Sequence, residues 1–250
     1  MAKSAPRKLE VVRSRLLTPH MLRLTLGGKE LEGFPDDSNS AYIKLKMTTP
    51  PADSDERPMI RTYTVRDFDA DKLELDVDFV MHADQGPASD WAHSAQPGDK
   101  MVILGPGPKK LVDYSADWFL LAGDMSALPA ISANIEGMPA DAKGHVLLEI
   151  IAAEDRQELD FPADIEVQWI VNPHPDSENT LLLDAVRSIS FLEGRPSIWV
   201  AGEFSSVLAI RSYLRKERGV DRKDIYVSSY WQMGKSEDEH RVAKSRAKES

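Results

Sequence analysis

The sequence contains no cysteine among its 250 residues. Disulfide bonds, thiol nucleophiles, cysteine-ligated zinc and cysteine-ligated iron–sulfur clusters are therefore excluded. The sequence also has no run of about 18 apolar residues, the length that a membrane-spanning helix needs. Its first residues lack the apolar segment of a secretory signal, so we expect a cytoplasmic protein.

Positive charge is in short supply. Lys and Arg total 31 against 41 Asp and Glu, which gives a formal net charge of −10. A protein that coats nucleic acid needs surplus cations to neutralise phosphates, so that class of protein is not expected. A local basic patch for a small anionic ligand is compatible with this balance, because local potentials rather than net charge steer small ligands.

Several catalytic and binding signatures are missing as well. The 6 histidines show no HExxH or comparable ligand spacing, so we expect no metal bound directly by the protein. The absence of GxSxG argues against a serine hydrolase. The absence of GxGxxG means that a tightly held dinucleotide is not implied.

The first half of the chain is typical of short β-strands. Residues 42–47 (YIKLKM) alternate polar and apolar side chains, as a strand with one buried face does. Clusters of Gly, Pro, Asp and Asn, which favour turns, separate this segment from similar ones. The pattern predicts a small antiparallel barrel or sandwich with strands at residues 8–17, 21–26, 42–47, 60–66, 73–81 and 101–104.

The pattern changes after residue 108, where short, continuous apolar runs begin. Such runs suit parallel strands that are buried on both faces. Segments with helical spacing of apolar residues lie between them, and alternating strands and helices predict βαβ units and a parallel sheet. We therefore predict two domains, residues 1–113 and 114–250, the second ending in a charged tail. The apolar runs lie at residues 118–122, 146–151, 165–171, 198–201 and 225–227.

The segment RTYTVR at residues 61–66 carries the most chemical information in the first half. In a strand, Arg61 and Tyr63 share one face, and Thr64 and Arg66 share the other. A guanidinium suits a phosphate, a tyrosine ring stacks on a flat heterocycle, and a threonine hydroxyl bonds a ring heteroatom. The alternative is an ordinary amphipathic strand with exposed arginines.

A second informative segment covers residues 78–92, where a strand leads through a turn into a helix. Ser89 is a plausible N-cap of that helix, although it could lie one residue inside. Amides at a helix N-terminus attract a phosphate or pyrophosphate. The alternative is an ordinary capped helix. Joined to the preceding segment, this turn predicts a planar-ring site and a phosphate site within one barrel.

Together, these motifs resemble the siderophore-interacting protein family of FAD-containing ferric-siderophore reductases, which share the fold of ferredoxin–NADP reductases. The likeness continues through residues 122–131, 199–203, 211–215 and 229–234, so it covers nearly the whole chain. Three positions depart from the family's frequent residues, with Ser126 in place of Thr, Ser229 in place of Gly and Gln232 in place of Arg.

The resemblance implies a six-stranded antiparallel FAD-binding β-barrel followed by a Rossmann-like domain. The resemblance implies that FAD is bound by Arg61, Tyr63, Thr64, Asp78, Val80, His82, Ala88 and Ser89. It also implies cofactor contacts at Asp124 and Ser126, which follow the first strand of the second domain. Glu203, Tyr230 and Trp231 are expected at the nicotinamide and the face of the flavin. Each assignment in the second domain has a structural alternative. Asp124, Ser126 and Glu203 follow strands, where such residues also stabilise the start of the next helix, and Tyr230 and Trp231 could be ordinary core aromatics.

The implied reaction is the reduction of a ferric siderophore to release Fe(II). A flavin accepts a two-electron hydride and passes on single electrons, which iron requires. The donor is NADH, NADPH or a reduced ferredoxin. Glu154 and Asp155 after the second strand of that domain favour the ribose of NADH, whereas Arg156 favours the phosphate of NADPH, and we expect NADH.

We expect a basic patch to capture the siderophore, because many ferric siderophores are anionic. The candidates are Lys44 and Lys46 on one strand face, and Arg241, Lys244 and Lys248 in the tail, which is otherwise simply solvated. Two other functions stay open. One is a general flavin or ferredoxin-type reductase, and the other is a non-catalytic siderophore-binding protein that releases iron.

Overall fold

The chain divides between its first and second halves into two units, Met1–Lys110 and Leu111–Ser250, which are considered separately below. The structure is a computed structural model, and it describes residues 5–48, 58–81, 86–176, 179–235, 239–240 and 243–245. No helix in these described ranges is long and apolar enough to cross a membrane.

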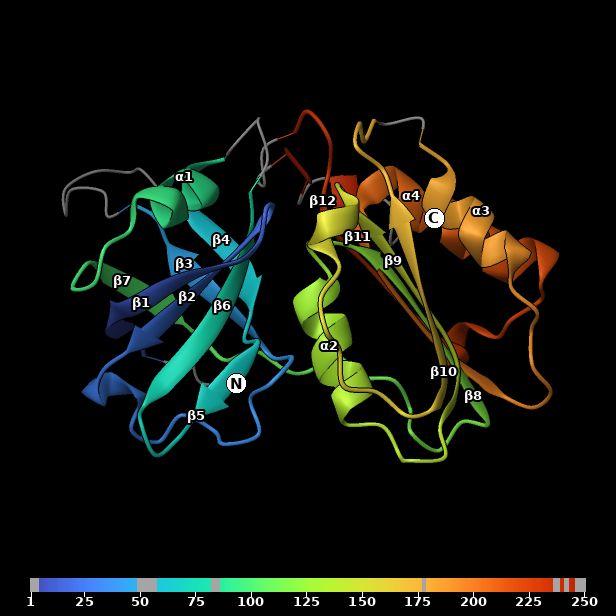
Figure 1. The fold of residues 1–250 in the computed structure, drawn as a ribbon, viewed down its shortest axis with the longest axis horizontal. Coiled ribbons are helices and arrows are strands. Elements are labelled where there is room, and N and C mark those ends of the chain that lie inside the picture. Colours follow the sequence, from blue (N-terminus) through green and yellow to red (C-terminus); the bar gives the residue numbers. More distant parts are fainter. Residues whose placement is uncertain are drawn as a thin grey trace. The chain divides into compact units, whose positions relative to one another are not determined.

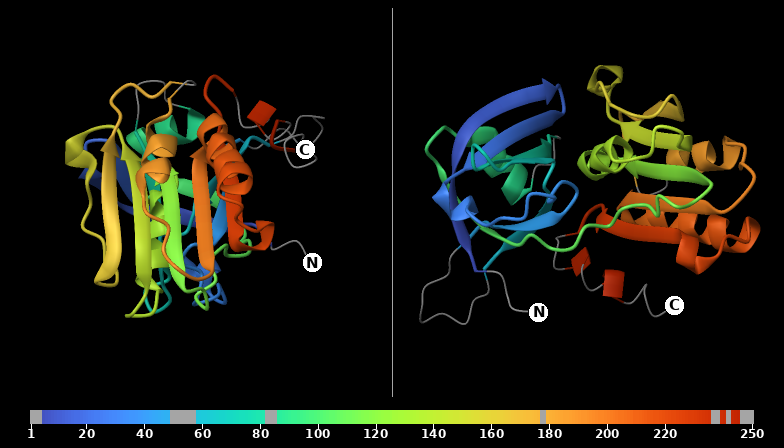
Figure 2. Two further views of the ribbon diagram at one scale, coloured as in Figure 1. Left: turned by 90° about the vertical axis from the view of Figure 1, so that its right-hand side faces the viewer. Right: turned by 90° about the horizontal axis from the view of Figure 1, so that it is seen from below.

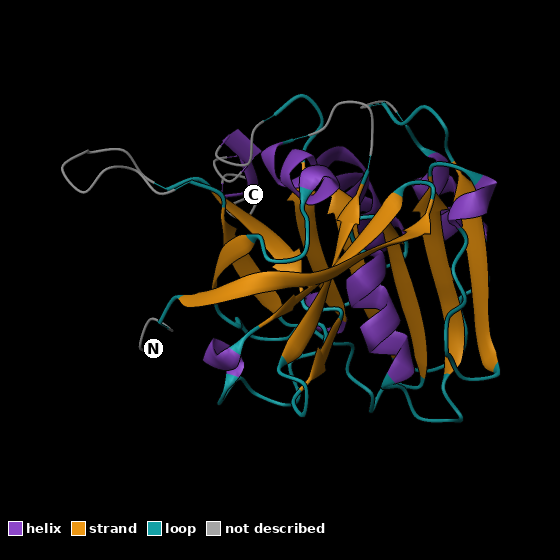
Figure 3. Ribbon diagram, turned by 60° about the vertical axis from the view of Figure 1, so that its left-hand side comes forward, coloured by secondary structure: helices purple, strands orange, loops and turns teal. Residues whose placement is uncertain are grey.

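The described residues of the first unit form an antiparallel sheet and the α-helix α1 (Pro87–Ser94), and strand dominates the unit (orange in Figure 3). Its strands follow the order β4-β3-β7-β1-β2-β6-β5. The predicted antiparallel β-fold is confirmed. The strands are β1 (Arg7–Thr18), β2 (Met21–Gly27), β3 (Tyr42–Lys46), β4 (Ile60–Thr64), β5 (Asp67–Asp69), β6 (Glu74–Val80) and β7 (Lys100–Leu104).

This sheet differs in two respects from a closed, six-stranded barrel. Its described residues form seven strands, because the short β5 lies at residues 67–69, between the strands expected at residues 60–66 and 73–81. The outermost strands β4 and β5 are not joined by a hydrogen-bonded ladder within the described residues. The alternation in β3 is as expected. Ile43 and Leu45 are fully buried on one face of the strand, and Lys44 and Lys46 lie on the other face.

The second unit is a parallel sheet in the order β10-β9-β8-β11-β12, with helices on both faces. Figure 1 shows α2 on one face and both α3 and α4 on the other, and the left view of Figure 2 shows the strands side by side. The predicted Rossmann-like sheet is confirmed. The elements are β8 (Trp118–Asp124), α2 (Leu128–Glu136), β9 (Lys143–Ile150), β10 (Asp164–Val171), α3 (Leu181–Ser188), β11 (Pro196–Glu203), α4 (Phe204–Ser212) and β12 (Ile225–Trp231).

Burial on both faces explains the continuous apolar runs. In β8, residues 118–123 are all buried, as expected for a central strand between two helical layers. The strand order reverses between β8 and β11, the first and fourth strands of the sheet. In open sheets of this kind, ligands bind beyond the carboxyl ends of the strands at such a switch point. The fold therefore directs attention to Asp124 and Glu203, the last residues of these two strands.

Candidate functional site

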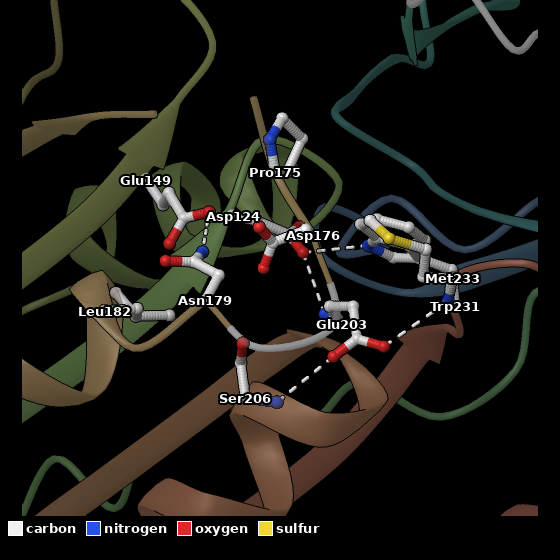
Figure 4. A pocket seen from close by; sticks show the side chains of 10 residues that line it. All are labelled: Asp124, Glu149, Pro175, Asp176, Asn179, Leu182, Glu203, Ser206, Trp231 and Met233. Carbon is white, nitrogen blue, oxygen red and sulfur yellow. Dashed lines mark hydrogen bonds between the residues drawn. The ribbon is translucent and has the colours of Figure 1, made fainter. Parts of the chain in front are cut away.

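The carboxylate of Asp124 joins the carboxyl ends of three strands. Its Oδ2 accepts hydrogen bonds from the backbone N–H of Glu203 at 2.8 Å and from the indole Nε1 of Trp231 at 2.8 Å. Its Oδ1 accepts bonds from the backbone N–H of Ser126 at 2.9 Å and from the hydroxyl of Ser126. Asp124 therefore does not cap α2, whose N-cap is Ala127, but ties β8 to β11 and β12 (Figure 4).

Close approach of this carboxylate requires glycine at position 202. Gly202 has φ +144°, a conformation that L side chains rarely adopt, and a Cβ there would lie 2.5 Å from the Oδ2 of Asp124. Sequence and geometry therefore agree that the residue beside Asp124 on β11 carries no side chain.

The carboxylate of Glu203 caps helix α4. Its Oε2 accepts hydrogen bonds from the backbone N–H groups of Ser205 and Ser206, and its Oε1 accepts one from the N–H of Met233 at 3.3 Å. Glu203 is 8% exposed. A carboxylate at a helix N-terminus is favourable in itself, so the structural role anticipated as the alternative is present at Glu203.

A small cavity of about 20 Å³ opens beside these residues (Figure 4). Glu149, near the end of β9, lines it, and its Oε1 accepts bonds from the amides of Asn172 and Asn179, both at 2.9 Å. Burial raises the pKa of Glu149, and so do the charges of Asp124 and Glu203. Burial likewise raises the pKa of Asp124, against the four hydrogen bonds that favour its ionised form.

The two aromatic residues at the end of β12 have different surroundings. Trp231 lines the cavity and bonds Asp124. The ring of Tyr230 instead meets the fully buried Trp199 edge-to-face, with centroids 6.3 Å apart, and burial raises the pKa of its hydroxyl. The structure thus brings Trp231 together with Asp124, Ser126 and Glu203, and places Tyr230 against the core.

In the first unit, Arg61 and Tyr63 lie on the same face of β4, opposite Leu45 and Ile43 of β3. Tyr63 packs against Phe79 of β6 with ring centroids 4.4 Å apart, and Phe79 in turn lies 6.2 Å from the ring of Trp91 in α1. This aromatic row connects the RTYT strand to helix α1.

Helix α1 begins at Pro87, two residues before Ser89. Its N-cap is Gly86, which has no side chain to cap the helix, and Pro87 occupies the first turn. The N-cap prediction for Ser89 is wrong, because Ser89 lies inside the helix and its hydroxyl donates to the carbonyl of Val80 at 3.2 Å. That bond ties the helix start to the end of β6, and both Ser89 and Ala88 are buried.

The side chain of Asp78 is occupied by an ion pair. Arg23 donates to it twice, from Nε to Oδ1 at 2.6 Å and from a terminal nitrogen to Oδ2 at 2.8 Å. Asp78 is 7% exposed, and the bidentate hydrogen bonds from Arg23 offset the free-energy cost of burying its charge. The carboxylate of Asp78 is therefore engaged in an ion pair within the first unit.

The lysines of β3 face away from Arg61 and Tyr63. Lys44 lies directly opposite Thr62, and Tyr42 opposite Thr64, so both lysines share the face of these threonines. The structure therefore brings Lys44 and Lys46 together with Thr64 on one face of the β3–β4 pair.

Comparison with known proteins identifies the family of this chain. The model of the "Siderophore-interacting protein" family matches residues 116–234, and that of the "Siderophore-interacting FAD-binding domain" matches residues 10–55 and 48–110. The chain belongs to the siderophore-interacting protein family. The resemblance recognised from the RTYT strand and the later motifs is thereby confirmed.

Individual members of the family support this assignment. The chain is 38% identical to the ferric vibriobactin reductase ViuB of Vibrio cholerae over 93% of its own length and 92% of that protein. It is 37% identical to the siderophore-interacting protein SipS of Aeromonas hydrophila, whose crystal structure it matches with a TM-score of 0.89 over 99% of both chains. A ferredoxin–NADP⁺ reductase of Plasmodium falciparum, 11% identical, matches with a TM-score of 0.61 over 90% of this chain and 96% of that one, which shows the shared fold.

Four of the residues that the sequence predicted for the site have not yet been located. His82, Arg241 and Lys248 lie outside the described residues. Lys244 is partly buried, and its ammonium donates to the hydroxyl of Ser228 at 2.9 Å and to the carbonyl of Ser229 at 2.6 Å. The sequence reasoning missed Glu149, Asn172 and Asn179. The one available signal was the Glu inside the apolar run VLLEII, where a charge needs partners.

Proposed function

We propose that this protein is a cytoplasmic, FAD-dependent ferric-siderophore reductase. Its family, and its 38% identity to a ferric vibriobactin reductase over nearly the whole length of both chains, support this function. The observation in the molecule itself that carries the proposal is the aromatic row Tyr63–Phe79–Trp91, which links the RTYT strand to the start of helix α1.

The first unit offers what FAD needs. Arg61 supplies a cation for a phosphate, Tyr63 a ring for stacking, and Thr64 a hydroxyl. The start of α1, with Gly86 as N-cap and buried Ala88 and Ser89, fits a pyrophosphate, because unpaired amides and the helix dipole favour anions there. We place the backbone of Asp78 and Val80 beside the same group. Bound FAD supplies the conversion between hydride and single-electron transfer.

We propose that the electron donor meets the carboxyl ends of β8 and β11. Asp124, Ser126, Glu203 and Trp231 are the residues assigned there, and NADH is the favoured donor, with NADPH and a reduced ferredoxin as the alternatives. Asp155 does not support a ribose contact, because it is fully buried and its Oδ2 accepts the N–H of Ala152 at 2.9 Å. Glu154 and Arg156 are both exposed, and of these the acidic residue favours NADH.

The ferric siderophore is the proposed substrate, and Lys44 and Lys46 are its proposed contacts in the first unit. In support of this assignment, both lysines share a face of the β3–β4 pair with Thr64, a residue assigned to the flavin. An anionic complex approaching this face meets both cations, and added salt should slow its capture by screening.

A spectroscopic titration of the purified protein tests the function. The proposal expects a yellow chromophore that NADH bleaches and a ferric siderophore re-oxidises with formation of Fe(II). A general flavin reductase would be bleached but not preferentially re-oxidised by ferric siderophores. A colourless chain that binds a siderophore without turnover would contradict the proposal.

Flavin retention by variants tests the assigned residues. Arg61→Ala should lower FAD affinity by about tenfold or more, since a charge-assisted hydrogen bond contributes roughly 1.5–3 kcal/mol. The matched control is Arg15→Ala, which removes an exposed arginine of β1 in the same unit. Equal FAD content in the two variants would refute the assignment of Arg61.

A further inference from the structure

A second recess lies in the second unit, along strand β12 and helix α4. Among the described residues, it shares no lining side chain with the cavity at Asp124. Its volume is about 540 Å³, within the range of roughly 300–1,000 Å³ that pockets for ligands occupy. We name it the basic groove, because its lining includes Arg211, Arg215, Arg222 and Lys244.

The charge of the basic groove is opposite to that of the chain. The protein carries a formal net charge of −10, yet no Asp or Glu is among the described residues that line this groove. The four cations also come from separate segments, namely α4, the turn that follows it, the 3₁₀ turn Arg222–Asp224 and the C-terminal segment. The fold therefore gathers positive charge at one place on an acidic protein.

The basic groove follows the edge of β12 rather than one of its faces. Ile225 and Val227 pack against the apolar core on the side of α4. The ring of Tyr226 points to the opposite side, where its centroid lies 5.7 Å from that of Trp199. Since all three β12 residues line the groove, the groove crosses the edge between the two faces. β12 is the outermost strand in the described part of its sheet, and such a strand presents backbone groups with which another chain can pair.

Cations lie at both ends of this edge. Arg222 precedes the first residue of β12 by three positions. Lys244 is fixed at the other end, because its ammonium donates to the hydroxyl of Ser228 at 2.9 Å and to the carbonyl of Ser229 at 2.6 Å. The strand between these cations, from Ile225 to Ser228, extends about 13 Å at roughly 3.3 Å per residue. A segment of about four extended residues matches this length.

The α4 side of the basic groove carries the other two cations. Arg211 belongs to α4, and Arg215 follows it in the π-helical turn Tyr213–Glu217. A terminal nitrogen of Arg215 donates to the carbonyl of Val220 at 2.7 Å, which uses one of the five N–H donors of the guanidinium. A ligand that pairs with the edge of β12 therefore meets positive charge along its length as well as at its ends.

We propose that the basic groove binds an extended, acidic segment of a partner protein, which adds to the sheet as a strand beside β12. In this mode of recognition, backbone pairing with the exposed edge gives affinity, and side chains at alternate positions give specificity. In the segment that fits this groove, carboxylates at alternate positions face the arginines on the α4 side, and apolar residues between them face Tyr226.

The same features select the kind of partner. A strand that carries positive charge is repelled at this edge, whereas an acidic strand neutralises the cations. A flat anionic membrane surface does not enter a recess and offers no backbone to pair with. The binding needs no redox step and does not depend on the proposed reductase function, so either proposal can fail without the other.

Fluorescence polarisation of labelled peptides, titrated with the full-length protein, tests the proposal. A peptide of about eight residues in which Glu and Val alternate should bind, and its affinity should fall as salt is added. The same peptide with Lys in place of Glu should not bind. Two further versions, each N-methylated at one alternate set of backbone amides, keep the charges, and the version whose methyl groups face β12 should bind at least about tenfold more weakly.

Variants of the protein locate the binding. Arg215→Gln/Arg222→Gln should weaken binding of the acidic peptide by about fivefold or more, as expected for the loss of two exposed ion pairs. The matched control is Lys216→Gln/Lys223→Gln, which removes two exposed cations that do not line the groove, and affinity should change less than about twofold. Arg222→Gln alone, which leaves the Arg215–Val220 bond intact, should weaken binding about twofold or more and replaces the double variant if that variant folds poorly.

Four results would overturn the proposal. They are failure of the wild-type protein to bind the acidic peptide, equal binding of the Lys peptide, full binding of both methylated versions, and equal affinity in the two double variants. Arginine-dependent binding to vesicles that contain phosphatidylserine, without binding of the peptide, would also overturn it and would assign the groove to a membrane surface instead.

Discussion

The indole of Trp231 donates a hydrogen bond to Asp124, 107 positions earlier in the chain, and so fastens the last strand of the parallel sheet to its first. The same carboxylate oxygen accepts the N–H of Glu203. The side chain of Asp124 therefore links by hydrogen bonds the three strand ends at which the electron donor is proposed to bind. Substitutions of the residues around it test how much each one contributes.

Trp231→Phe removes the indole donor but keeps an aromatic ring. We expect a loss of about 1–3 kcal/mol in the free energy of unfolding, because a partly buried carboxylate oxygen loses a partner. If the ring also meets the donor or the flavin, the rate of flavin bleaching should fall much further in Trp231→Ala than in Trp231→Phe. Urea unfolding and stopped-flow absorbance measure the two effects. Equal rates in the two variants would assign Trp231 a purely structural role.

Gly202→Ala should destabilise the second unit by about 2 kcal/mol or more, because the new Cβ would clash with the carboxylate of Asp124 in a strained backbone conformation. Gly219→Ala is the control, since Gly219 also has a positive φ, +68°, but a Cβ there meets nothing within 4 Å. Thermal unfolding measures the loss in each variant, and the loss at position 202 should exceed that at position 219. Similar losses in the two would show that the approach of Asp124 contributes nothing.

Arg23→Gln should cost about 3–5 kcal/mol, because it leaves the buried carboxylate of Asp78 without its bidentate partner. The control is Lys72→Gln, which breaks the exposed pair with Asp69 and should cost less than about 1 kcal/mol. Arg23→Lys should recover only part of the loss, since an ammonium lacks the planar fork. Urea unfolding curves that place Arg23→Gln level with Lys72→Gln would refute this ranking.

The C-terminal segment should loosen in mild acid. His240 is 5% exposed and makes a 2.8 Å hydrogen bond with the hydroxyl of Ser229, and its ring meets Phe204 edge-to-face. Burial lowers the pKa of His240 below its ordinary value of 6.5. The charge of Lys244 lowers this pKa further, and the charge of Glu203 partly opposes both effects. The unfolded state then binds the proton more readily, so stability present at higher pH is lost as the pH falls below 6.5.

Hydrogen exchange of the amides at residues 239–240 and 243–245, corrected for intrinsic rates, measures this loosening at pH 7.5 and 5.5, values chosen about a unit either side of an ordinary histidine pKa. His240→Gln keeps a polar side chain without the titration and should abolish the pH dependence. A local measurement is needed, because the raised pKa values of Asp124 and Glu149 act on global stability in the opposite sense. Unchanged protection between the two pH values would contradict the prediction.

Periodicity and composition were sufficient for the architecture, because burial on one face or on two leaves a direct record in the sequence. The alternation of Ile43 and Leu45 with lysines and the uninterrupted run at residues 118–123 both correspond to observed strands. The three-residue strand β5 is different. It is too short for any period to show, and its antiparallel pairing with β6 defines it as a strand.

Side-chain partners were harder to foresee. The capping role of Glu203 follows from its place after a strand, which the sequence displays. The partners of Asp124 come from positions 126, 203 and 231, and those of Glu149 from positions 172 and 179, so they depend on tertiary structure. Ser89 was misplaced at the helix start because Gly86 and Pro87 can begin a helix without a side-chain cap.

The bond from Lys244 to the carbonyl of Ser229 has a consequence for how the protein behaves at high concentration. β12 is the outermost strand of its sheet, and a strand in that position presents backbone groups to which a second chain can add. Lys244 occupies one of these groups and brings a positive charge to the strand, both of which discourage such pairing. Removal of the chain from residue 241 onward should therefore promote self-association through β12, detectable by light scattering.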